Sequence, residues 1–221
     1  MMMNLFVVFD PVSVFGFHLN WISLFLGLVF LPLGFWVLPS RYVVFLKEIT
    51  NGLSKEVGFL YSSKWGGVEL LLVTLFWFIV FNNFLGLFPF IFTATSHILV
   101  TLGLALPVWF SLMIFGWLNS TSEMFAHLVP LGTPFALMNF MVLIETVSNL
   151  IRPITLSVRL AANMIAGHLL IVLLGSAISL SVSSLCFGLF SLGLLFLLES
   201  AVAFIQSYVF MILVGLYSAE V

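Results

Sequence analysis

The stretch Ser157–Leu170, SVRLAANMIAGHLL, places an arginine, an amide and a histidine inside a run that otherwise favours a lipid-exposed helix. Arg159 is charged at any cellular pH, and a charge at bilayer depth costs about 2.5–3.5 kcal/mol on insertion scales. Such a residue predicts a functional site. The alternative is an arginine that extends to the headgroups, although about nine mostly apolar residues flank Arg159 on each side.

The composition defines the class of protein. Hydrophobic residues make up 63% of the chain, charged residues only 6%, and the mean hydropathy is +1.31, whereas soluble proteins have about 25% charged residues. A polytopic membrane protein is therefore predicted. The net charge of −2, without a basic patch, argues against a nucleic-acid partner. A single cysteine, Cys186, excludes an internal disulfide.

The N-terminus begins with Met1–Leu5, which has neither a basic segment nor a small-residue cleavage site, so we expect no removable signal or transit peptide. Residues 15–38 follow as an apolar, uncharged run apart from His18. That run is long enough for a first membrane crossing.

Residues 41–64 differ sharply from their surroundings, because four of the six basic residues lie there among apolar side chains. This pattern favours an amphipathic helix on the membrane surface, with a polar loop as the alternative. The basic residues indicate that the segment faces the electrically negative inner side. The N-terminus is accordingly expected outside.

Two further crossings are predicted over residues 68–90 and 98–118, and they form a helical hairpin. Residues 119–134 are polar enough for a loop or a short surface helix. His97 and His127 lie at the expected membrane interfaces, where we expect them to be solvated.

Residues 135–175 could form two short crossings or one very long helix. The only candidate turn, Arg152-Pro153, lacks the Gly, Asn or Asp that a reversal needs, and a proline alone kinks a helix. One helix of about 60 Å must lie tilted or bent in a core about 30 Å thick. Residues 185–217 repeat the pattern, so the predicted fold is all-α, with five to six membrane helices that include a hairpin of two long, steeply tilted ones.

The polar residues of the two long helices are predicted to lie opposite one another. At 100° per residue His168 points away from Arg159, whereas one direction on the first helix is shared by Glu145, Asn149, Arg152, Arg159 and Asn163. If the two helices are antiparallel, three pairs of polar residues are predicted to lie at the same height in the membrane. These pairs are Arg159 with Gln206, His168 with Glu199, and Glu145 with Glu220. Close approach of the two helices is favoured by small residues: Ala161, Ala162, Ala166, Gly167, Ser200, Ala201 and Ala203.

Proton transfer through two separate polar niches is the chemistry that these groups favour. An imidazole changes charge near neutral pH, and His168 can exchange a proton with Glu199 on the outer side. Glu145 offers an acceptor on the inner side. Arg159 stands between the niches and repels a proton, and Glu145 is about 21 Å away along the helix. A carboxylate supplied by a moving partner is the natural carrier.

Several motifs resemble one known family. Residues 145–170, residues 198–210, the Phe81–Pro89 segment and Thr95-Ser96-His97 are similar to subunit a of the mitochondrial ATP synthase, over nearly the whole chain. The resemblance is greatest to invertebrate members. It implies a non-catalytic membrane subunit in the mitochondrial inner membrane, with its N-terminus in the intermembrane space and its C-terminus in the matrix. Neither a cofactor nor a metal is implied.

The resemblance also implies roles for single residues. Arg159 matches the family's essential stator arginine, which faces the ring of c subunits. His168 and Glu199 match the entry half-channel, and Glu145 matches the exit half-channel. Asn163 and Gln206 match polar residues that flank the arginine. Glu220 matches no family feature, and the implied partners are the c-subunit ring, other stator subunits and the lipid bilayer.

Rival functions fit the sequence less well. A secondary proton-coupled transporter would also bury charges, but the chain has no internal repeat and no pair of broken crossings in matching halves. A structural anchor leaves Arg159, His168 and Glu199 unexplained. An enzyme with its own nucleotide site would need a phosphate-binding glycine loop, which the sequence lacks.

Overall fold

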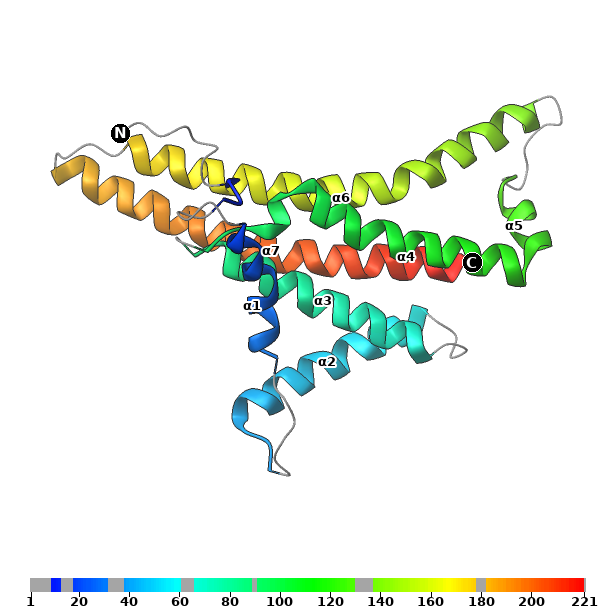
Figure 1. Cartoon of the computed structure of the whole chain (residues 1–221), viewed down its shortest axis with the longest axis horizontal. Helices are drawn as coiled ribbons and strands as arrows, with labels where there is room; N and C mark the ends of the chain where they lie inside the picture. Colours follow the sequence, from blue (N-terminus) through cyan, green and yellow to red (C-terminus); the bar gives the residue numbers. More distant parts are fainter. Residues whose placement is uncertain are drawn as a thin grey trace.

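A computed structural model describes residues 9–12, 18–31, 38–60, 66–88, 91–129, 137–177 and 182–220. Within these ranges every regular element is helical, which confirms the predicted all-α class (Figure 1). The elements in chain order are η2 (Leu19–Ile22), α1 (Ser23–Val29), α2 (Arg41–Leu60), α3 (Gly66–Gly86), η3 (Ala94–Ser96), α4 (Ile98–Asn119), α5 (Thr121–His127), α6 (Met138–Ala177) and α7 (Val182–Glu220).

Within the described residues, four helices are long and apolar enough to cross a membrane, which confirms a polytopic protein. They cover Gly67–Gly86, Ile98–Asn119, Met138–Ala177 and Leu185–Ser218. The expected first crossing at residues 15–38 stays a prediction. Its described part is an apolar helix over Leu19–Val29, which is too short to span the core, and residues 13–17 and 32–37 lie outside the described ranges.

The two C-terminal helices are each continuous. α6 has 40 residues and α7 has 39, so the single long helix, and not the pair of short crossings, is confirmed. Pro153 lies inside α6, where it cannot donate the backbone hydrogen bond to the carbonyl of Asn149. Figure 1 shows that α6 is bent in its middle, as expected where a proline interrupts the hydrogen-bond ladder.

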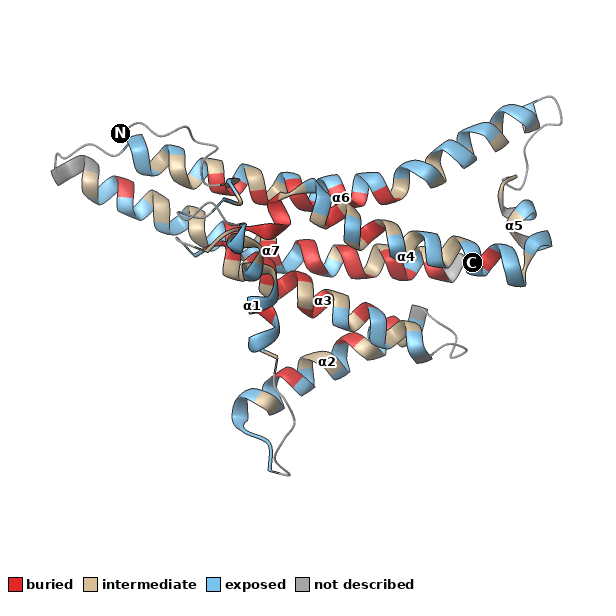
Figure 2. Cartoon of the chain, viewed as in Figure 1, coloured by how far each residue is buried: buried red, intermediate tan, exposed pale blue. Residues whose placement is uncertain are grey.

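The core lies where α3, α6 and α7 meet. α3 packs mainly on α7, and α4 packs mainly on α6. Buried residues gather at this crossing and along the C-terminal half of α7, whereas both ends of α6 and the N-terminal part of α7 are largely exposed (Figure 2). The most buried apolar side chains include Leu72 and Ile79 of α3, Leu160 of α6, and Phe210 and Met211 of α7. The crossing therefore fixes the middle of both long helices.

The basic segment forms a helix, and the polar-loop alternative is wrong. α2 buries Leu46, Leu53 and Val57, which recur at helical spacing on one face. Its basic residues Arg41 and Lys55 are exposed. α2 packs against α3 and α7, so the face that carries these three residues is covered by the protein itself, whereas Phe45 and Phe59 are exposed.

Candidate functional site

Arg159 and His168 lie on opposite faces of α6, as the helical period predicts. Arg159 is exposed, and no ion pair joins it to a described residue. The exposed residues near it in the sequence include the apolar Val158 and Ile154 and the polar Thr155. His168 is only 9% exposed. One face of α6 thus presents a cation outward, and the other directs an imidazole into the protein.

Asn163 and Gln206 join the two long helices. The Asn163 Nδ2 donates a hydrogen bond of 2.9 Å to the Gln206 Oε1, and Gln206 is 6% exposed. The predicted partner of Gln206 is therefore wrong: its side chain meets Asn163, one helical turn from Arg159. The short amide of Asn163 points toward α7, while the longer Arg159 side chain remains on the open face.

Glu199 is buried against a glycine of α6. The carboxyl group occupies the space that a Cβ atom at Gly167 would fill, and Glu199 is 8% exposed. The predicted level of His168 with Glu199 is thus confirmed to within one residue. A larger side chain at position 167 would overlap the carboxyl group, so the end of the Glu199 side chain would have to move.

The surroundings of His168 come from several segments. Its ring makes a hydrogen bond to the backbone of Gly86 at the end of α3. The ring of Phe9 meets it edge to face, with centroids 6.3 Å apart. Its Nε2 atom is buried and has no hydrogen-bond partner among the described residues. His168 therefore retains an unused polar atom inside the membrane domain.

Other buried polar atoms near the helix crossing share this property. Within the described ranges, partners are lacking for both side-chain polar atoms of Asn83, the Thr95 Oγ1 and the Gln206 Nε2. A buried polar group without a hydrogen-bond partner destabilises the folded protein, and buried water molecules commonly provide the missing hydrogen bonds. The sequence analysis assigned no individual role to Asn83 or Thr95. An amide side chain within an apolar membrane-spanning segment indicates a functional site, and this signal would have identified Asn83.

His97 differs from the expectation of a solvated interface residue, which was wrong. Its ring centroid lies 5.3 Å from both Trp21 and Phe92, and its Nε2 is 3.0 Å from the carbonyl oxygen of Phe9. His97 is thus half-buried and holds the segment that covers His168. The side chain of His127 lies outside the described residues.

Glu145 is paired within α6. The Arg152 Nη2 lies 3.5 Å from the Glu145 Oε1, and the Arg152 guanidinium carbon lies 4.8 Å from the ring centroid of Tyr217 on α7. Sequence reasoning placed Arg152 on the face of Glu145 but assigned it no function. The predicted level of Glu145 with Glu220 stays a prediction, because the Glu220 side chain lies outside the described residues.

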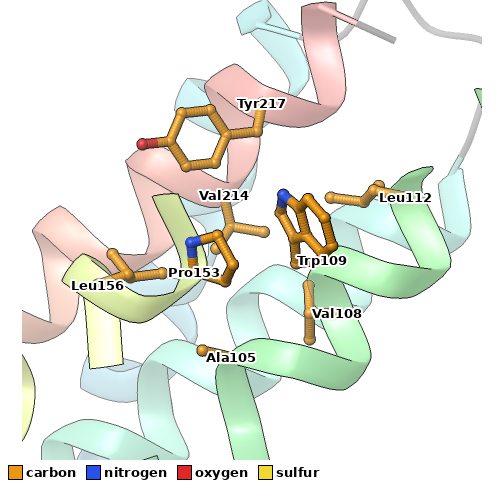
Figure 3. Close-up of a pocket in the computed structure, with 8 residues that line it drawn as sticks. All are labelled: Ala105, Val108, Trp109, Leu112, Pro153, Leu156, Val214 and Tyr217. Carbon is orange, nitrogen blue, oxygen red and sulfur yellow. The ribbon is translucent and has the colours of Figure 1, made fainter. Parts of the chain in front are cut away.

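A small cavity lies beside this pair, between α4, α6 and α7 (Figure 3). Its volume is about 10 Å³, room for roughly one water molecule. Pro153, Val214 and Tyr217 are among its lining residues. The cavity is too small for a substrate, and Tyr217 lies at its wall between the three helices.

Charged and amide groups at the crossing of long apolar helices are typical of membrane proteins that translocate ions or protons. These features define the class of protein.

Comparison with known proteins shows which family within this class the chain belongs to. A family model described as ATP synthase A chain matches residues 17–219. The chain is 56% identical to an ATP synthase subunit a of Drosophila melanogaster, 54% to that of Locusta migratoria and 53% to that of Artemia franciscana, in each case over 100% of both chains.

The chain therefore belongs to the ATP synthase A chain family, and the resemblance inferred from its motifs is confirmed. Membership assigns it to the proton-translocating membrane sector of the ATP synthase. The residues that would move the protons are considered next.

Proposed function

We propose that this chain is the proton-conducting stator subunit of the mitochondrial rotary ATP synthase. Two offset half-channels pass protons to and from the carboxylates of a c-subunit ring, and Arg159 prevents a direct leak between them. The chain lies in the inner membrane beside other stator subunits. Its N-terminus faces the intermembrane space and its C-terminus the matrix, an orientation supported by the basic residues of α2.

The observation that carries this proposal is the exposure of the Arg159 side chain on a mostly apolar helix that is long enough to span a membrane, with no ion pair to a described residue. A guanidinium in hydrocarbon without a counter-charge is unfavourable. A carboxylate presented by a neighbouring subunit resolves this, and the attraction favours the ionised form of each arriving carboxyl group. The arginine thereby promotes proton release from the ring.

The two niches lie at different depths along α6. Gly167, which contacts Glu199, is about 12 Å from Arg159 along the helix axis, and Glu145 is about 21 Å away in the other direction. His168 and Glu199 serve the entry half-channel, and the unsatisfied polar atoms near the helix crossing favour water there. Glu145 serves the exit half-channel. Asn163 and Gln206 hold the two helices together beside the arginine.

The proposal is tested by Arg159→Ala in the assembled synthase of inner-membrane vesicles. We expect ATP synthesis to be lost and passive proton permeability to rise, because both the attraction and the barrier disappear. Arg41→Ala is the matched control, since it removes an exposed cation from α2. Continued synthesis in a fully assembled Arg159→Ala complex would refute the proposed role of Arg159.

A further inference from the structure

Arg152 lies between the two charged groups that the proposed function uses on α6. Glu145, Arg152 and Arg159 follow one another at intervals of seven residues, which is about 10.5 Å along a helix and within about 20° of one direction. A proton that leaves the ring near Arg159 and reaches Glu145 must therefore pass the height of Arg152. The proposed function gives Arg152 no task.

The contacts of Arg152 extend in two directions. Toward the end of α6 that carries Glu145, its Nη2 lies 3.5 Å from the Glu145 Oε1. Toward α7, its guanidinium lies over the ring of Tyr217, 4.8 Å from the centroid. The two charged side chains are 24% and 31% exposed, so the pair is only partly open to its surroundings. One side chain thus connects the carboxylate of Glu145 to the neighbouring helix.

The ring of Tyr217 is itself held in place. It lines the small cavity together with Pro153, the residue that follows Arg152, and Val214 (Figure 3). That cavity has room for roughly one water molecule, so little space is left on this side of the ring. A cation over an aromatic face is attracted by the ring quadrupole, so Tyr217 limits the positions that Arg152 can adopt.

We propose that Arg152 is a positioning residue for Glu145, and that Tyr217 holds Arg152 in the required position. Two turns separate the carboxylate from the arginine along the helix, so both long side chains must extend toward each other to meet. Without the guanidinium, the Glu145 carboxylate is free to turn toward the headgroups and away from the path of the proton. This inference rests on the proposed role of Glu145 in the exit half-channel.

The test is a double-mutant cycle in the assembled synthase of inner-membrane vesicles. ATP-driven proton pumping is measured for Glu145→Gln, Arg152→Gln and the double variant, and each rate is divided by the amount of intact complex. We expect each single variant to be slower by about tenfold. If Arg152 acts through Glu145, the double variant is no slower than Glu145→Gln, because non-additivity reveals a shared function.

Conservative variants separate positioning from general support of the fold. Arg152→Lys keeps the charge and should recover part of the rate. Tyr217→Phe keeps the aromatic face and should pump normally, whereas Tyr217→Leu should slow pumping in the wild-type background but not in Glu145→Gln. Arg41→Gln controls for the loss of a cation elsewhere.

The outcomes that overturn the inference differ from those that overturn the proposed function. If Arg152→Gln slows pumping by the same factor with Glu145 or Gln at position 145, Arg152 does not act through Glu145. If Arg152→Gln pumps normally while Glu145→Gln is slow, Arg152 has no positioning function. A normal rate for Glu145→Gln itself refutes the exit role of Glu145, and the positioning role with it.

Discussion

The Nδ2 of Asn163 donates a hydrogen bond to the Oε1 of Gln206, and this 2.9 Å contact sets the level at which the two long helices meet. It lies one helical turn from Arg159, which remains on the exposed face of α6. The contact therefore supports the helix that carries the arginine without occupying the guanidinium. Loss of the contact should loosen the position of the arginine.

This hydrogen bond predicts that substitutions of Asn163 and of Gln206 have non-additive effects on ATP synthesis. Interhelical hydrogen bonds in membrane proteins contribute about 0.6 kcal/mol on average and up to about 1.7 kcal/mol. We expect Asn163→Leu and Gln206→Leu each to slow ATP synthesis by about threefold or more, and the double variant to be no slower than the worse single one. The measurement is the synthesis rate per assembled complex. Losses that multiply in the double variant contradict a shared bond.

A side chain at position 167 should displace the Glu199 carboxyl group. A Cβ atom there would overlap that group, which lies at the end of a flexible side chain and can shift. Gly167→Ala should displace Glu199 and slow proton-driven synthesis by about tenfold. Gly175→Ala is the control on the same helix, because among the described residues no atom beyond its own stretch of helix lies within 4 Å of its Cβ position. Equal rates in the two variants would show that the position of Glu199 is unimportant.

Glu199 itself should be needed for proton exchange. Glu199→Gln keeps the size of the buried side chain but cannot take up and release protons. We expect assembly to continue while ATP synthesis and ATP-driven pumping fall at least about tenfold. The control is Glu56→Gln, whose carboxylate on α2 accepts a hydrogen bond from Tyr208 at an exposed position. Unchanged synthesis in an assembled Glu199→Gln complex rules out the relay.

His97 should keep the Phe9 segment closed over His168. Its Nε2 contacts the Phe9 carbonyl oxygen, so a cysteine at position 9 leaves that contact intact. In a Cys186→Ser background, we expect His97→Ala to increase labelling of Phe9→Cys by a membrane-impermeant thiol reagent several-fold. His18→Ala is the control, because His18 is exposed. If both histidine variants label at the same rate, His97 does not hold the segment.

The sequence by itself determined the helical class, the length of α6 and α7, and the opposite directions of Arg159 and His168. These features are local. Backbone hydrogen bonds join residues four apart, and side chains repeat every 3.6 residues, so a single segment contains the information. The bend at Pro153 could be anticipated for the same reason, because proline removes a hydrogen bond within its own helix.

Only the tertiary structure decided which residues meet between segments. The partner of Gln206 is Asn163 and not Arg159, because the choice between two residues one helical turn apart depends on how the side chains of both helices interlock. Phe9, Gly86 and His168 come together from three distant segments, and Arg152 finds Tyr217 on another helix. Such contacts depend on the packing of whole helices, which no periodicity within one segment encodes.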